Sequence, residues 1–198
     1  MRRPSNRQRR IVILVLAALA FGIAYYAGMH HPSERAHSPP IQGMAIDPPT
    51  PIPPFDLTDQ RGAPFTQDDL QGQWSLLLLD PAGNPIPSPA LVLLMQIHNR
   101  LASRPKLQNS IHFIYLPRWR EAALSESIDR LGSHLTGLSG EPDKVDETFR
   151  QFGVEIGDSE ALFFLIGPNQ RLHALFTQSE DAATIAQDLS QLIDNQKP

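Results

Sequence analysis

The sequence predicts an α/β domain that follows a single transmembrane helix. Three observations predict it: an uncharged apolar run at residues 11–29, three short apolar runs with the length of buried strands, and helical periodicity between and after those runs. The length of 198 residues suits one membrane anchor and one globular domain. No cysteine is present, so the chain itself cannot supply a disulfide, a thiolate nucleophile, a Cys-based metal site or dithiol redox chemistry.

Charge is divided unevenly along the chain. The first ten residues contain five arginines and no acidic residue, whereas the other 188 residues carry 12 basic and 21 acidic side chains, a net charge of −9. A portion this acidic is poorly suited to bind a phosphate backbone. No nucleic-acid partner is therefore expected, and the arginines need a different explanation.

Residues 11–29 have the length and composition of a transmembrane helix. At about 1.5 Å per residue they span about 28 Å, close to the bilayer core of about 30 Å. Tyr25 and Tyr26 lie near the far end, where aromatic rings favour the interface, and the basic segment 1–10 stays cytoplasmic by the positive-inside rule. We expect a single-pass protein of a bacterial inner membrane with a periplasmic C-terminal domain. The alternative is a signal peptide cleaved at Ala18-Leu19-Ala20, although the apolar run continues past that point.

Residues 30–54 are expected to be a proline-rich linker. Eight of these 25 residues are proline, which excludes a helix or a central strand and favours extended polyproline conformation with a reach of up to about 75 Å. In and beside this segment lie soft or borderline ligands for copper or zinc, namely Met29, His30, His31, His37 and Met44. A solvated linker that happens to contain histidines is the simpler interpretation.

The globular domain is expected to span residues 55–198. Residues 55–62 alternate and then turn, as at the start of a hairpin, and residues 74–79 are a nearly unbroken apolar run typical of a strand buried on both faces. Ser88 and Pro89 match the N-cap and first position of a helix. The apolar face of that helix carries Leu91, Leu94, Met95, His98 and Leu101. His98 is interpreted as a packed histidine rather than a metal ligand.

The second half of the domain alternates strands and helices. Residues 111–116 predict a second strand that Pro117 ends, and residues 121–131 place Leu124, Ile128 and Leu131 in helical register. The remaining expected elements are a helix opened by Pro142 with Val145, Phe149 and Phe152 on one face and Gly153 at its end, a strand at 161–166, a turn at 167–170, an antiparallel strand at 171–176, and a last helix from about Ser179 with Glu180 and Asp181 in its first turn.

Helices between buried strands predict crossover connections and a partly parallel sheet. A β-hairpin followed by a packing helix is the second half of a thioredoxin-like fold. We therefore predict a thioredoxin-like α/β fold with an N-terminal β-hairpin extension; a generic α/β domain is the alternative that periodicity alone leaves open.

Four segments resemble the Sco/SenC family of membrane-anchored thioredoxin-fold proteins. They are Phe55-x-Leu57-x-Asp59-Gln60-x-Gly62, Asp69-Leu70-x-Gly72-x-Trp74, Gly137-Leu138-Ser139-Gly140 and Phe164-Leu165-Ile166-Gly167-Pro168. Their order and spacing fit over most of residues 55–193. The resemblance implies a role in assembling the copper site of cytochrome c oxidase, with oxidase subunits or other assembly factors as partners.

The residues that carry the family's chemistry are replaced. The resemblance places copper ligands in a Cys-Pro-x-x-x-Cys-Pro-like loop and in a distal Asp-His segment, but Asn84 and Ser88 stand at the cysteine positions and Ser159 at the histidine position. An acidic residue expected before Pro117 is Leu116. An amide and two hydroxyls are hard, neutral donors that hold Cu(I) poorly. The resemblance thus implies a degenerate member, and we assign no catalytic, cofactor-binding or metal residue and no cofactor.

Two other groups of residues are candidates for a functional role. Ser88, His98 and Asp80 do not form a recognisable hydrolase pattern, and an N-cap explains Ser88 better than a nucleophile does. The run Pro117-Arg118-Trp119-Arg120 is a candidate docking patch because Trp and Arg are enriched in interface anchors. The alternative is a Trp packed on the adjacent helix with solvated arginines.

These observations lead to three hypotheses. The first is a non-enzymatic accessory or assembly factor for cytochrome c oxidase that acts by protein–protein interaction without canonical copper binding. The second is a copper metallochaperone that uses the His and Met residues of the linker. The third, a thiol redox enzyme, is excluded in any form in which this chain supplies the thiol.

Overall fold

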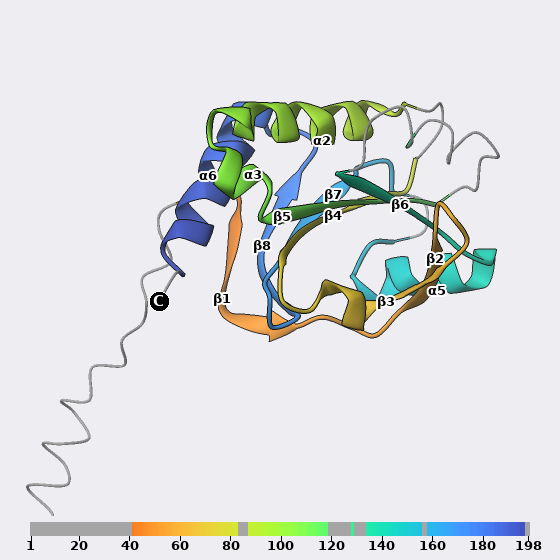
Figure 1. Cartoon of the computed structure of the whole chain (residues 1–198). Coiled ribbons are helices and arrows are strands. Elements are labelled where there is room, and N and C mark those ends of the chain that lie inside the picture. Colours follow the sequence, from red (N-terminus) through yellow and green to blue (C-terminus); the bar gives the residue numbers. More distant parts are fainter. Residues whose placement is uncertain (1–40, 83–86, 119–127, 129–133, 156–157, 197–198) are drawn as a thin grey trace, which may run out of the picture. The chain divides into compact units, whose positions relative to one another are not determined.

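The computed structural model describes residues 41–82, 87–118, 128, 134–155 and 158–196. Eight strands form one sheet in the order β1-β8-β7-β4-β5-β6-β2-β3 (Figure 1). The strands are β1 (Met44–Pro51), β2 (Asp56–Asp59), β3 (Pro64–Thr66), β4 (Trp74–Asp80), β5 (Ile111–Pro117), β6 (Leu135–Ser139), β7 (Leu162–Ile166) and β8 (Arg171–Thr177). The helices are η1 (Gln67–Leu70), α2 (Pro89–Arg100), η2 (Leu101–Ser103), α3 (Pro105–Gln108), α5 (Pro142–Gln151) and α6 (Ala182–Asp194).

The centre of the sheet is mixed, as predicted. β4 pairs in parallel with β5 and antiparallel with β7, and β5 pairs in parallel with β6. Every residue of β4 is buried, which explains why its sequence is continuous rather than alternating. The predicted hairpin of β2 with β3 and the antiparallel return of β8 along β7 are confirmed.

The two faces of β4 pack against different helices. Leu76 and Leu78 belong to a core with buried side chains of α2 and α6, whereas Leu77 and Leu79 belong to a second core with α5, β2 and β3. Figure 1 shows α2 and α5 on opposite sides of the sheet. The N-cap at Ser88 and the helix start at Pro142 are confirmed. Gly153 follows α5 with φ of 77°, the left-handed conformation that favours glycine after a helix.

The first strand differs from the expected linker. Met44–Pro51 form β1, which pairs antiparallel with β8 at the edge of the sheet. An edge strand tolerates proline because its outward N–H groups need no partner in the sheet. Pairing also breaks between Ala45 and Thr50, the interval that contains Pro48 and Pro49. The folded part of the chain therefore begins before Phe55.

Other boundaries differ from the sequence-based expectations. β6 was not predicted, because five residues that include Thr, Gly and Ser give no apolar run. The last helix starts at Ala182 rather than near Ser179, because Asp181 is its N-cap and accepts from the N–H groups of Ala183 and Thr184. The helix expected at 121–131 lies outside the described residues except for Ile128, which is buried.

The expected membrane anchor at residues 11–29 also lies outside the described residues. Among the helices that the structure describes, none is long and apolar enough to cross a bilayer.

Candidate functional site

Three buried polar side chains meet at the carboxyl ends of the parallel strands β4 and β5. Asp80 is the last residue of β4, Tyr115 lies on β5 opposite Leu78, and Ser88 precedes α2. Asp80 and Ser88 are each 2% exposed and Tyr115 is fully buried. Ligand sites of α/β sheets lie at the carboxyl ends of the strands. The loop that joins Asp80 to Ser88 is also the segment in which the sequence resemblance placed metal ligands.

Hydrogen bonds join these three side chains directly. The hydroxyls of Ser88 and Tyr115 both donate to Oδ2 of Asp80, the latter at 3.1 Å. Ser88 Oγ also accepts from the backbone N–H of Leu91 at 3.1 Å, which is the N-cap interaction of α2. The Asp80 carboxylate also lies near the start of α2, where a negative charge is favoured by the helix dipole. The Ser88 hydroxyl therefore has a structural function.

This arrangement does not fit a copper ligand. The Ser88 hydroxyl is a hard donor already occupied by Asp80 and Leu91, and Asn84 lies outside the described residues. Ser159 is exposed and precedes β7. Because Leu162 of β7 pairs with Leu79 of β4, the segment around Ser159 and the loop after Asp80 lie at the same end of these two strands. Over the described ranges, no group of three or more His, Cys, Asp or Glu side chains could hold a metal.

His98 takes no part in the Asp80–Ser88 contact. Its ring packs edge-on against Phe113 at 5.1 Å and stacks on His134 at 5.4 Å, and the Gln108 amide donates to its backbone carbonyl at 2.8 Å. Burial is the main cause that lowers the pKa of His98. The interpretation of His98 as a packed histidine is confirmed, and Ser88, His98 and Asp80 do not form a hydrolase constellation.

Two further histidines lie in the sheet, of which His173 is buried and His112 is half-buried. The ring of His173 meets Trp74 edge-on at 4.9 Å and its Nδ1 lies 2.8 Å from the Gln196 amide nitrogen. His112 Nε2 lies 2.7 Å from the hydroxyl of Thr136 on the neighbouring strand β6. Burial lowers the pKa of both imidazoles, and Arg171 lowers the pKa of His173 further. Burial therefore disfavours the charged form of both rings.

The candidate docking patch is only partly described. The Arg118 guanidinium forms a bidentate pair with Asp146 of α5, with Nε–Oδ1 at 2.8 Å and Nη2–Oδ2 at 3.3 Å. This pair raises the pKa of Arg118 and lowers the pKa of Asp146. Arg118 therefore links β5 to α5 rather than projecting freely, while Trp119 and Arg120 lie outside the described residues.

The segments that carried the resemblance have structural roles. Asp59 Oδ1 accepts from the N–H groups of Arg61 and Ala63 and so closes the β2–β3 turn. Gln60 accepts from the N–H of Gly137, which ties the hairpin to β6. A Cβ at Gly137 would lie 2.8 Å from Ile128, so this position requires glycine. The resemblance is therefore carried by residues that hold the fold.

A family model described as SCO1/SenC matches residues 44–194. The chain belongs to the SCO1/SenC family. Solved structures show the same fold in other Sco proteins. Yeast Sco1 with copper bound has a TM-score of 0.64 and 22% identity over 76% of this chain and 96% of that chain. BsSco, a member of the Sco family of cytochrome c oxidase assembly proteins, has a TM-score of 0.56 and 16% identity over 75% and 97%.

The thioredoxin-like Sco fold is also similar to that of an enzyme. The peroxidoxin BcpB from Mycobacterium tuberculosis has a TM-score of 0.57 and 15% identity over 78% of this chain and 99% of that chain. No curated protein matches the chain. The SCO1/SenC match starts at residue 44, which is also the first residue of β1.

Tyr115 was missed as a site residue in the sequence because the apolar run of β5 gave it the pattern of a core aromatic.

Proposed function

We propose that this SCO1/SenC protein is an accessory or assembly factor for cytochrome c oxidase that acts by binding partner proteins and does not carry copper through the family loop. The observation that supports it best is the engagement of Ser88 by Asp80 and Leu91 where the family has a metal-binding cysteine. A hydroxyl held in this way contributes no soft donor. The family match and the similarity to BsSco support the link to oxidase assembly.

We also propose that the protein is anchored in the inner membrane and that it is not an enzyme. The arginines of residues 1–10 and the apolar run 11–29 support an inner-membrane anchor with the domain in the periplasm. The similarity to a peroxidoxin concerns the fold, and fold alone does not determine activity. Without cysteine, this chain supplies no thiol for peroxide or disulfide chemistry.

Co-purification tests the assembly role. The full-length protein, extracted from native membranes in mild detergent, should bring down oxidase subunits or assembly factors, and deletion of its gene should lower assembled oxidase. An unrelated single-pass protein of similar abundance serves as the control for non-specific capture. If neither enrichment nor loss of oxidase is found, the assembly role is wrong.

Copper titration separates this proposal from the linker-based metallochaperone. The full-length protein should bind no Cu(I) more tightly than micromolar, whereas Asn84→Cys/Ser88→Cys/Ser159→His, checked for folding, should gain affinity and serves as the positive control. Tight binding by the natural sequence that is lost on changing His30, His31 and His37 to Ala would favour the metallochaperone. Met44, the described member of that ligand set, is 62% exposed on β1.

A further inference from the structure

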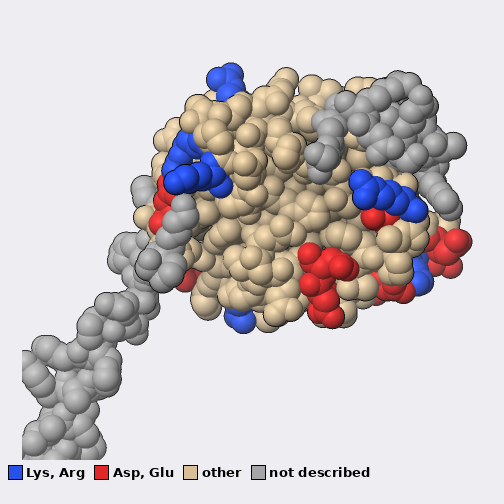
Figure 2. Space-filling view, viewed as in Figure 1, with Lys and Arg blue, Asp and Glu red and all other residues tan. Residues whose placement is uncertain are grey.

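Negative charge is concentrated at one end of the described domain. The described residues within 56–70 and 141–160 contain 11 acidic and 3 basic side chains, whereas the remaining described residues contain 6 acidic and 5 basic ones. Figure 2 shows several groups of acidic side chains toward the end of the sheet that carries β2 and α5, where basic ones also lie, and further basic side chains on the side of α3 and α6. These two stretches, which form β2, β3, η1, α5 and the loops beside them, are called the acidic end below; Arg118, which follows β5, also reaches Asp146 there.

A groove opens in the acidic end between α5 and the chain that enters β2. Its volume is about 400 Å³, and its lining is largely apolar, with Pro54, Phe55 and Thr148 among the residues that form it. Phe55 is held in place by Phe65 and Phe152, with ring centroids 6.3 and 6.4 Å away. The groove is therefore preformed, and its volume lies in the range of small ligand pockets and is sufficient for one large apolar side chain.

Carboxylates also line this groove. Asp56 comes from β2, and Asp143 and Glu147 come from successive turns of α5. Lys144 pairs with Asp56, and Arg150 pairs with Glu147 at 2.7 Å. All four of these paired side chains are about half exposed or more, and exposed pairs contribute little to stability. An incoming cation can therefore exchange with Lys144 or Arg150 at low cost.

We infer that this groove docks a partner protein through a cationic segment that carries one large apolar side chain. The apolar side chain would lie in the groove against Phe55, while flanking Lys or Arg side chains would face Asp143 and Glu147. An acidic end of this size repels anionic lipid and nucleic acid. The inference does not depend on the copper loop or on the oxidase role, so it can fail or succeed independently of the proposed function.

Peptide binding to the full-length protein in zwitterionic nanodiscs tests this inference. The probe is a labelled Gly-Lys-Lys-Trp-Lys-Lys-Gly peptide, read by fluorescence anisotropy at low salt with empty nanodiscs as the blank. Its affinity should fall at least 5-fold in Asp143→Asn/Glu147→Gln. It should stay within 2-fold in Glu180→Gln/Asp194→Asn, which removes the same charge outside the acidic end. Replacing Trp in the peptide by Gly should weaken binding at least 10-fold.

A second variant separates the groove from the charge around it. Gln151→Trp on α5 fills the groove without changing the charge, and it should remove the preference for Trp over Gly in the peptide. Equal effects of the two charge variants, indifference to the Trp, or no binding at low salt would each overturn the inference. Self-association that Asp143→Asn/Glu147→Gln abolishes would also overturn it, because the occupant would then be a second copy of this chain.

Discussion

The hydroxyl of Ser88 donates to Asp80 and accepts from the N–H of Leu91, so one small side chain joins the end of β4 to the start of α2. Tyr115 donates to the same carboxylate oxygen from β5. A sulfur atom at this position is larger than oxygen and a weaker hydrogen-bond donor and acceptor. An oxygen atom at residue 88 therefore favours this structural role and is a poor ligand for copper.

Removing this hydroxyl should be costly. Ser88→Ala deletes an N-cap and leaves the buried Asp80 carboxylate with one donor fewer, so we expect the free energy of unfolding to fall by about 2–4 kcal/mol. Urea unfolding measures it. Ser159→Ala removes the other hydroxyl that replaces a family ligand, but from an exposed position, so it is the matched control and should change stability by less than about 0.5 kcal/mol. Equal values for both variants would contradict the structural role of Ser88.

At the scale of single elements, β1 depends on α6 as well as on β8. Oδ2 of Asp188, a buried residue of α6, accepts from the N–H groups of Gln42 at 2.8 Å and Gly43 at 3.0 Å. The Arg171 guanidinium of β8 donates to the carbonyl of Pro49. A Cβ at Gly43 would lie 2.3 Å from Phe176, so glycine allows this close approach. These contacts compensate for the incomplete ladder of a proline-containing strand.

The contacts of Asp188 with Gln42 and Gly43 are called the β1 clamp below. Weakening this clamp should let β1 detach before the rest of the sheet unfolds. In Asp188→Asn, two charge-assisted hydrogen bonds become neutral or are lost, and amide exchange of Gln42–Thr50 should accelerate by about 10-fold or more. Hydrogen exchange measured by mass spectrometry follows it, with β4 and β7 as internal references.

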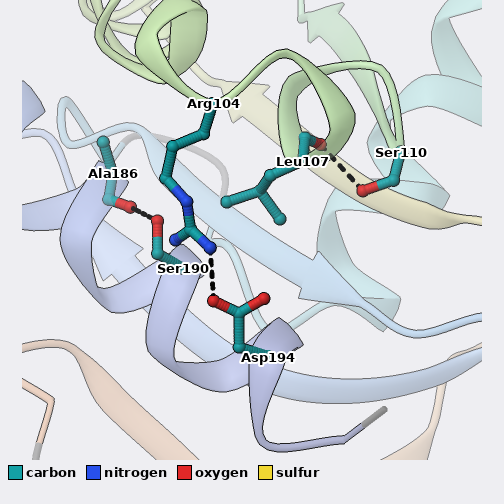
Figure 3. Close-up of polar contacts among 6 residues, drawn as sticks. All are labelled: Arg104, Leu107, Ser110, Ala186, Ser190 and Asp194. Atoms are coloured by element: carbon teal, nitrogen blue, oxygen red, sulfur yellow. Dashed lines mark hydrogen bonds and ion pairs between the residues drawn. The ribbon is translucent and has the colours of Figure 1, made fainter.

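Asp194→Asn on the same helix is the control for that experiment. It disrupts the pair of Asp194 with Arg104 that Figure 3 shows between α6 and the start of α3. Because both side chains are 40% or more exposed, its effect should be small. Acceleration of β1 exchange in Asp194→Asn as large as in Asp188→Asn would show that the clamp is not specific.

For the whole molecule, three packed imidazoles make stability depend on pH. Burial lowers the pKa values of His98, His112 and His173 below the ordinary value of 6.5. The unfolded chain therefore binds protons that the folded chain does not, and the free energy of unfolding falls as pH drops below about 6.5. Asp146, whose pKa lies below its ordinary 3.8, loses its stabilising contribution only in more acidic solution.

Thermal unfolding at pH 7.5 to 5 checks this expectation. The melting temperature should fall as the pH drops below about 6.5, and the fall should be smaller in His173→Gln, which lacks one of the three packed imidazoles. His173→Gln also loses packing against Trp74, so the slope with pH, rather than the absolute melting temperature, is the quantity compared. An unchanged slope would exclude His173 as a source of the pH dependence.

The strongest sequence signals predicted the central strands β4, β5 and β7, whereas β1 and β6 were missed. Continuous apolar runs identified β4, β5 and β7 because these strands are buried on both faces. β6 and β1 gave no such signal. β6 is short, contains Thr, Gly and Ser, and forms by pairing with β5. β1 is held by Asp188 and Arg171, which come from distant parts of the chain. The sequence likewise identified Ser88 as an N-cap but not its contact with Asp80, which depends on where α2 starts relative to the sheet.

If residues 11–29 are the membrane anchor proposed above, the position of β1 limits how far the domain can lie from the bilayer. If the chain leaves the membrane at Met29, the tether is residues 30–40 rather than 30–54, because Ile41 packs against the core and Asp188 binds the N–H groups of Gln42 and Gly43. About 11 residues at roughly 3.1 Å each give a leash of about 34 Å instead of about 75 Å. Any client must then offer its contact surface within a few nanometres of the lipid headgroups.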